Sequence, residues 1–133
     1  MLFCVFGGNG SSGAAQFITR SIGGNSWSAP IDIPLDKQEG QLPEVFIFQG
    51  KVYAFQSGSG DIYQDSSLAV YDRDSATFHR APFHHHFDGT PAMLEFKGHL
   101  HVFFRVPGND TIMHRRSTDL DQWRAVRVVQ GAS

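Results

Sequence analysis

Histidines are the residues whose types and spacing come closest to a metal centre in this chain. In "HLH" at 99–101 two imidazoles occupy alternate positions, which would place both on one face of a strand as two zinc ligands require. The run "HHH" at 84–86 could supply a third ligand. However, that run falls between two internal repeats, and His101 takes the repeat position that Phe3 and Tyr53 hold. We therefore predict a packing role for His101, no metal site and no cofactor.

Motifs for nucleophilic catalysis and nucleotide binding are missing from the sequence. It contains no G-x-S-x-G turn, so a hydrolase with a nucleophilic serine is not expected. The stretch "GGNGSSG" at 7–13 lacks the lysine of a phosphate-binding loop and precedes no helical pattern, so we interpret it as a hairpin tip. We predict no catalytic residue.

The charge and the cysteine content of the chain limit the partners and the cross-links that can be expected. The 133 residues contain 11 Lys and Arg against 13 Asp and Glu, a net charge of −2 without blocks of like charge, so nucleic acid is not expected. The single cysteine, Cys4, excludes an internal disulfide. The apolar start "MLFCVFGGNG" is too short for a membrane span and follows no basic segment, so no signal peptide is predicted and cytoplasmic residence is the default.

Three internal repeats organise a single domain, 1–133. "LPEVFIFQGKVYAF" at 42–55 aligns with "TPAMLEFKGHLHVF" at 90–103 at a constant offset of 48 residues. Farther along, "SSLAVYDR" at 66–73 aligns with "TIMHRRST" at 111–118. The N-terminal third aligns "MLFCVFGG" with "KVYAFQSG", and it fits the template once its first strand is left out. The repeats cover about 1–40, 41–88 and 89–133.

One aromatic position recurs in all three repeats, as Trp27, Phe78 and Trp123. A large aromatic at the same place in every repeat is most simply a side chain that buries one sheet against the next. We therefore predict packing at this position, with ligand contact as the alternative.

Each repeat is predicted to be a four-stranded antiparallel meander. Apolar residues alternate with period two, and no window has sustained helical spacing. Glycines in "QGKV" and "KGHL" suit tight hairpin turns, and "MLFCVF", "KVYAFQ" and "HLHVFF" are expected to occupy equivalent inner strands. Repeats of 40 to 50 residues with four strands and a recurring aromatic indicate an all-β fold of β-propeller blades.

Two short stretches carry a family resemblance. "STDLDQW" at 117–123 and "SIGGNSW" at 21–27 resemble the aspartate-box turn, S-T-D-G-x-x-W, of sialidase-like propellers and of bacterial and fungal propeller lectins. Leu120 replaces the glycine of the motif in one copy and Gly23 the aspartate in the other, while "YDRDSATF" keeps only Phe78. The resemblance implies a structural turn, in which the Ser and Asp side chains bond backbone amides.

The repeat count predicts assembly. Propellers close with about 4 to 8 blades, so either several copies of the chain complete the ring or the chain is a fragment of a longer protein; we prefer assembly, in which two copies would give six blades. A homodimer is therefore expected, with the "QWRAVRVV" region of one chain beside the "MLFCVF" region of the other. The second fold is a β-trefoil, which closes with three repeats in one chain, although its Q-x-W signature is absent.

Sialidase-like catalysis would need an arginine cluster, a tyrosine nucleophile and two carboxylic acids. Candidates by type are Arg20, Arg80, Arg105, Arg115, Arg116, Tyr53, Tyr63, Tyr71, Glu44 and Glu95. Three similar blades offer little of the asymmetry that such a site needs. A fragment of a sialidase-like glycoside hydrolase is therefore the enzymatic alternative, and no enzyme activity is predicted.

Carbohydrate binding fits the composition better. Aromatic planes hold sugar C–H faces, and charged or amide groups bond the hydroxyls, so repeats can present several shallow sites between blades. We predict a multivalent, lectin-like module that binds glycans, with a protein-interaction or structural propeller as the alternative. The candidate ligand-binding residues are Arg105, His114, Arg116, Glu44, Tyr63, Trp27 and Trp123.

Overall fold

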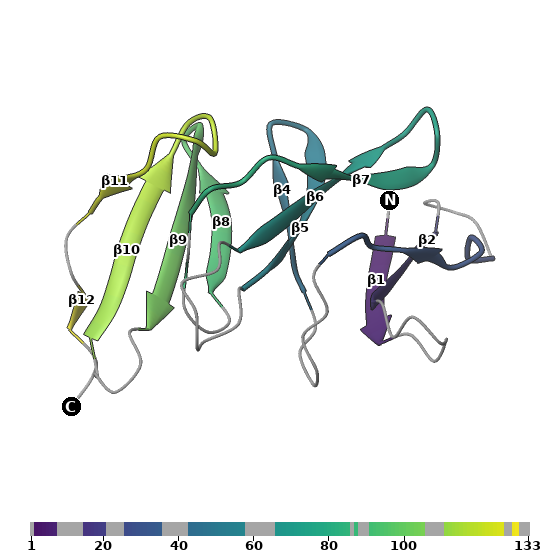
Figure 1. Ribbon diagram of the computed structural model, residues 1–133, viewed down its shortest axis with the longest axis horizontal. Coiled ribbons are helices and arrows are strands. Elements are labelled where there is room, and N and C mark those ends of the chain that lie inside the picture. The colour runs from purple at the N-terminus through teal and green to yellow at the C-terminus, as the bar shows by residue number, and fades with distance from the viewer. Residues whose placement is uncertain are drawn as a thin grey trace.

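The described residues of the chain form three antiparallel β-sheets that follow one another in chain order (Figure 1). The computed structural model describes residues 2–7, 15–20, 26–35, 43–57, 66–85, 87, 91–105, 111–126 and 129–130. Within these ranges every regular element is a strand. Among the same residues, no helix has the length and apolar character needed to cross a membrane. The prediction of an all-β, antiparallel protein is confirmed.

Each sheet is a meander in which strands adjacent in sequence are paired in space. The first sheet consists of β1 (Leu2–Gly7), β2 (Ala15–Arg20) and β3 (Ile31–Asp32). The middle sheet consists of β4 (Glu44–Phe48), β5 (Lys51–Gln56), β6 (Ser67–Asp72) and β7 (Thr77–Ala81). The third sheet consists of β8 (Ala92–Phe96), β9 (His99–Arg105) and β10 (Thr111–Ser117), with β11 (Arg124–Ala125) and β12 (Val129–Gln130) both paired to β10.

The predicted equivalent strands are β1, β5 and β9. β5 and β9 each lie between two neighbours in their sheets, whereas β1 forms an edge because the first sheet has only three strands. The strands that sequence repetition groups together therefore fall in three separate sheets.

Two-residue turns join β4 to β5 and β8 to β9. Gln49 and Gly50 have φ of 50° and 75°, and Lys97 and Gly98 have φ of 51° and 79°. Positive φ at both central residues defines a type I′ turn, whose twist matches the twist of the paired strands. The glycines of "QGKV" and "KGHL" thus make the predicted hairpins, and both hairpins lie at the same end of their sheets.

Strand pairing corrects the sequence alignment of the third strand of each repeat. Tyr53 pairs with Val70, and its counterpart His101 pairs with Arg116. The offset is therefore 48 for β5 and β9 but 46 for β6 and β10, one residue more than the alignment of "SSLAVYDR" with "TIMHRRST" gives. Because alternate residues face opposite sides of a sheet, this shift makes Ser117, not Arg116, the counterpart of Tyr71.

The apolar core lies between the sheets, and the middle sheet buries both of its faces. Against the third sheet it buries a cluster that comprises Phe46, Phe48, Phe55, Leu68, Phe83, Phe87, Leu100 and Val102. Against the first sheet it buries Val52, Ala54, Ala69 and Phe78 with Ile33. β4 lies against β8, and β3 against β7, so each sheet stacks face to face on the next.

The recurring aromatic has a different environment in each repeat. Phe78 is 6% exposed and belongs to the core. Trp123 is half-buried, with its ring centroid 5.1 Å from that of Phe87 and 6.3 Å from that of Phe83. Trp27 is 45% exposed. The predicted packing role is confirmed for Phe78 and Trp123, while Trp27 keeps a large part of its surface in solvent.

We predict that Trp123→Ala lowers the free energy of unfolding by about 3 kcal/mol, because the change empties the space between Phe83 and Phe87. Urea titration followed by circular dichroism measures this loss. Trp27→Ala removes the same side chain from a more exposed position and serves as the matched control, with a smaller expected loss. Equal losses for the two variants would contradict a packing role specific to Trp123.

Candidate functional site

The turn between β10 and β11 is held by two polar side chains. The Ser117 hydroxyl oxygen accepts hydrogen bonds from the backbone N–H of Asp119 (3.2 Å) and Leu120 (2.9 Å). The Asp119 carboxylate accepts from the N–H of Asp121 (2.9 Å) and Gln122 (2.8 Å), and from the Ser117 hydroxyl (3.0 Å). These bonds fix the path of the turn before the strand that follows.

Leu120 occupies a strained position in that turn. Its φ is 66°, in the left-handed region that favours glycine, and its position is the one where the resemblance noted above has glycine. The Trp123 indole N–H donates to the Leu120 carbonyl (3.2 Å), and the Leu120 side chain packs against the core. Packing and this hydrogen bond thus hold Leu120 in an unfavourable backbone conformation.

The turn between β6 and β7 is built in a similar way from different residues. The Asp72 carboxylate accepts from the Asp74 N–H (2.9 Å), and Ala76 has φ of 55°. The sequence "YDRDSATF" concealed this similarity, because the aspartate stands at the end of the strand rather than inside the turn. An aspartate directly before a four-residue connection was the signal that could have revealed it.

Hydrogen bonds to backbone amides stabilise the charged forms of both aspartates. The N–H groups of Gln122 and Asp121 lower the pKa of Asp119 below its ordinary value of 3.8. The N–H of Asp74 is the largest cause of a lowered pKa at Asp72, with smaller contributions from Ser75 and His79. Both carboxylates therefore stay ionised under ordinary conditions.

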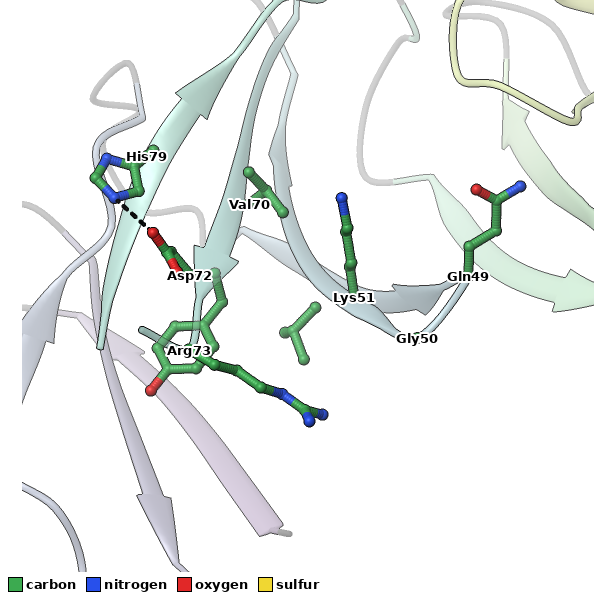
Figure 2. A pocket seen from close by; sticks show the side chains of 9 residues that line it. Gln49, Gly50, Lys51, Val70, Asp72, Arg73 and His79 are labelled. Carbon is green, nitrogen blue, oxygen red and sulfur yellow. Dashed lines mark ion pairs between the residues drawn. The ribbon is translucent and has the colours of Figure 1, made fainter. Parts of the chain in front are cut away.

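A hollow opens at the hairpin end of the middle sheet (Figure 2). This first hollow has a volume of about 520 Å³ and is lined by Gln49, Gly50, Lys51, Val52, Val70, Tyr71, Asp72, Arg73 and His79. Figure 2 shows His79 directed at Asp72, with 3.6 Å between the His79 Nε2 and the Asp72 Oδ2 atoms. The lining thus combines an aromatic ring with amide, carboxylate and cationic groups.

A second hollow opens at the hairpin end of the third sheet. It has a volume of about 310 Å³ and is lined by His99, Arg116, Ser117, Thr118, Gln122 and Arg124. The strands that form it are β9, β10 and β11, with the connection between the last two. It therefore lies on the same type of framework as the first hollow.

The two hollows occupy the same position of two successive repeats. Strand pairing relates His99 to Lys51 on the second strand of each sheet. It relates Arg116, Ser117 and Thr118 to residues 70–72 on the third strand. On the fourth strand, Arg124 corresponds to His79. Every residue that lines the second hollow except Gln122 therefore has a counterpart that lines the first.

Positive charge predominates in both hollows. The first contains Lys51 and Arg73 against the one carboxylate of Asp72, and the second contains Arg116 and Arg124. Within the described part of the chain, the charged side-chain groups of these four residues form no hydrogen bond or ion pair with another residue. Since the whole chain has a net charge of −2, the hollows concentrate positive charge locally.

The structure distributes the seven predicted ligand-binding residues over several places. Of the six that lie in the described ranges, only Arg116 lines one of these two hollows. His114 lies two residues before Arg116 on β10, and its Nε2 is 2.8 Å from the Nδ1 of His101. Burial, followed by the charges of His101 and Arg116, lowers the pKa of His114. Of the predicted ligand-binding residues, the third sheet therefore brings His114 and Arg116 onto one strand, but only Arg116 lines the second hollow.

The other predicted residues that the structure describes lie apart from the two hollows. Glu44 begins β4, at the opposite end of the sheet from Gln49, and burial raises the pKa of its carboxyl. Arg105 is exposed at the end of β9. Trp27 and Trp123 line neither hollow, and Tyr63 lies outside the described residues. Sequence reasoning missed Lys51, Arg73 and Arg124, whose common position becomes visible only through strand pairing.

The histidine-rich segments form contacts within the protein. The Nε2 of His85 lies 2.6 Å from the Asp121 carbonyl oxygen, and its ring meets that of Trp123 edge to face. His86 lies outside the described residues. In the ranges that are described, His, Cys, Asp and Glu form no group of three that could hold a metal ion.

Neither a protein-family model nor a curated protein matches the sequence.

We predict that Ala76→Gly raises the free energy of unfolding by about 0.5–1 kcal/mol, because glycine adopts positive φ without steric cost. Ala92→Gly is the matched control. Ala92 is also exposed but lies in strand β8 with ordinary φ, so the same exchange should destabilise the protein there. Urea titration of both variants measures the two changes, and a loss of stability in Ala76→Gly would contradict the assignment of strain.

We predict that the stabilising effect of Asp119 depends on pH. Its pKa is lower in the folded protein than the ordinary 3.8, so its contribution is complete above that value and disappears as the pH falls below it. The thermal midpoint of Asp119→Asn should lie below that of the wild type at pH 7, and the difference should shrink below pH 3.8. Asp121→Asn, whose carboxylate makes no hydrogen bond within the described residues, should match the wild type at pH 7. A difference that persists unchanged in acid would contradict the charge-assisted bonds.

Proposed function

We propose that this protein is a lectin-like module of sialidase-like β-propeller blades, and that its repeated hollows bind glycans. The proposal rests on one observation: strand pairing shows that the two hollows lie at equivalent positions of successive repeats. Meander sheets that stack face to face in chain order support blades over a trefoil. The Ser117 and Asp119 turn before an aromatic supports the resemblance to this class of repeat.

The charge of the hollows favours acidic glycans over neutral ones. Carboxylate and sulfate groups accept charge-assisted hydrogen bonds from guanidinium and ammonium groups, which are about twice as strong as neutral bonds. Lys51 and Arg73 supply such donors in the first hollow, and Arg116 and Arg124 in the second. Tyr71 adds a ring for a sugar C–H face in the first hollow only. We therefore assign an acidic glycan to both hollows.

Two equivalent weak sites can together bind a ligand with higher overall affinity than either site alone. Neither hollow is fully enclosed, so a single hollow contacts only part of one sugar. Two equivalent sites at the same end of neighbouring sheets can bind one branched or polymeric glycan at once, and the second contact then forms at a high effective concentration. The expected ligand is accordingly a chain with acidic groups at several positions.

We predict that Arg73→Gln weakens binding of a galacturonic acid oligomer about tenfold, the loss expected for one charge-assisted hydrogen bond. Isothermal titration calorimetry at low salt measures the affinity, with a neutral galactose oligomer of the same length as the comparison ligand. Arg80→Gln is the matched control, because Arg80 is an exposed arginine of β7 that does not line the hollow.

Three outcomes would count against the proposal. Equal affinity for the acidic and the neutral oligomer would contradict the proposed preference for acidic glycans. Equal losses in Arg73→Gln and Arg80→Gln would show that net charge, rather than the hollow, governs binding. No binding to any glycan on an array at high protein density would remove the lectin and favour a protein-interaction role.

A further inference from the structure

Two histidine side chains of the third sheet form a hydrogen bond with each other. The His101 Nδ1 atom lies 2.8 Å from the His114 Nε2 atom, and the two ring centroids are 5.1 Å apart. On β9, His101 lies between Leu100 and Val102, which are buried against the middle sheet, so the two imidazoles lie on the face that points away from that sheet. We call His101 and His114 the imidazole pair.

The imidazole pair is adjacent to the second hollow. Strand pairing places His101 directly opposite Arg116, and it places Arg116 opposite Arg124. Both arginines line the hollow. His99 also lines the hollow, and its ring centroid is 6.2 Å from that of His101. The pair therefore continues the lining of the second hollow along the same face of the sheet.

Aromatic contacts hold the two imidazole rings. The Phe103 ring stacks on His114, with centroids 4.2 Å apart and an angle of 19° between the planes. The Phe96 centroid is 6.2 Å from that of His101. Within the described residues, the outer nitrogens of the pair, His101 Nε2 and His114 Nδ1, form no further hydrogen bond. These two nitrogens can therefore bond a ligand.

The bond between the rings limits the number of protons that the pair can carry. A neutral imidazole has one donor and one acceptor nitrogen, whereas both nitrogens of the charged form donate. A neutral pair therefore has one N–H between the rings and one N–H on the outer nitrogen of the accepting ring. Uptake of one proton puts an N–H on both outer nitrogens and adds one positive charge. A second proton would set two N–H groups against each other and break the bond.

The charged groups around the pair are cations. On the strands of this face, the charged and titratable residues are His99, Arg105, Arg116 and Arg124, while β8 contributes Ala92, Leu94 and Phe96. In the turn before β9, the Lys97 Nζ atom lies 5.3 Å from the centroid of the Phe96 ring. Glu95, the one carboxylate on β8 to β11, pairs with Leu100 and so belongs to the opposite face. An anion on this face therefore meets no carboxylate of these strands.

Burial and neighbouring charges favour the neutral form of His114 in neutral solution. Burial, followed by the charges of His101 and Arg116, lowers the pKa of His114 below its ordinary value of 6.5. The additional positive charge of the pair is therefore acquired in mildly acidic solution.

We propose that the imidazole pair is an acid-activated anion subsite, which extends the second hollow and binds a carboxylate or sulfate group of the next sugar along an acidic glycan. The protonated pair presents two N–H donors and a positive charge beside Arg116, and such charge-assisted hydrogen bonds are about twice as strong as neutral ones. The neutral pair presents one acceptor in place of a donor. The subsite rests on the proposed function, and it makes binding at the second hollow tighter in acid.

The first hollow has no equivalent of this subsite. The pairing of Phe103 with His114 corresponds to the pairing of Phe55 with Leu68 in the middle sheet. Phe55 is 1% exposed and Leu68 is 2% exposed, because the third sheet covers them. The gain in acid that comes from the imidazole pair therefore belongs to the second hollow alone.

Isothermal titration calorimetry with a galacturonic acid oligomer tests the subsite at about pH 8 and about pH 5, the limits between which imidazole changes its charge. Carboxyl groups with ordinary pKa values of about 4 remain ionised in this range. The wild type is expected to bind more tightly at the lower pH. The double variant with His101→Gln and His114→Gln should lose about fivefold of this gain, the upper end for one exposed ion pair.

Two comparisons isolate the contribution of the pair. The double variant keeps any gain that comes from His79 and His99, the imidazoles that line the hollows themselves. His84→Gln is the matched control, because His84 is an exposed histidine that lines neither hollow. This variant should show the full gain of the wild type.

Nitrogen NMR of the wild type without ligand measures the pair directly and needs no variant. Between the same two pH values, His101 and His114 should together take up one proton, because interacting groups titrate as a pair and the second proton breaks their bond. Uptake of no proton, or of two, would overturn the subsite.

The calorimetry separates failure of the subsite from failure of the proposed function. An equal gain in the wild type and in the double variant would overturn the subsite alone. Absence of binding at both pH values would overturn the proposed function, and the subsite with it.

Discussion

Burial of both faces of the middle sheet is the constraint on which the rest of the structure depends. A four-stranded meander has two faces to cover, and here Phe46, Phe48 and Phe55 are buried on one side and Val52 and Ala54 on the other. Hydrophobic burial is the dominant favourable term in folding, and this sheet contributes most of the buried apolar residues of the described chain. The neighbouring sheets are therefore positioned by their contact with it.

The same stacking creates the hollows. The third sheet contacts the middle sheet through β8 and β4, so this face of the middle sheet is filled near the first strand of its repeat. The third and fourth strands carry the polar lining, including Asp72, His79, Arg116 and Arg124. The polar residues at one end of the repeats differ while the framework stays the same. Lys51 stands where the next repeat has His99, and His79 where it has Arg124, without a change in the apolar contacts. The repeats can therefore present surfaces that are similar but not identical.

Much of the fold could be predicted from the sequence, because alternation and hairpin glycines are local signals. They identified β5 and β9 and the turns at Gly50 and Gly98. The site was less predictable. Its lining comes from three strands, and a single-residue error in the alignment of β6 with β10 moves Arg116 to the wrong face. Sequence similarity did not reveal that error, because Tyr71 and Ser117 share a position through backbone pairing although their side chains differ in size and in aromatic character.

A hydrogen bond of the Gln49 side chain connects the two candidate sites. Gln49 lines the first hollow, its backbone N–H donates to the Glu95 carboxylate (2.7 Å), and its side-chain amide donates to the Thr118 carbonyl oxygen (3.0 Å). Thr118 in turn lines the second hollow. A ligand that displaces Gln49 in one site must therefore break or strain a hydrogen bond to the wall of the other. For any ligand that did so, the coupling free energy between the two hollows would be reciprocal by thermodynamic necessity, so that occupation of either hollow would change the affinity of the other by the same factor.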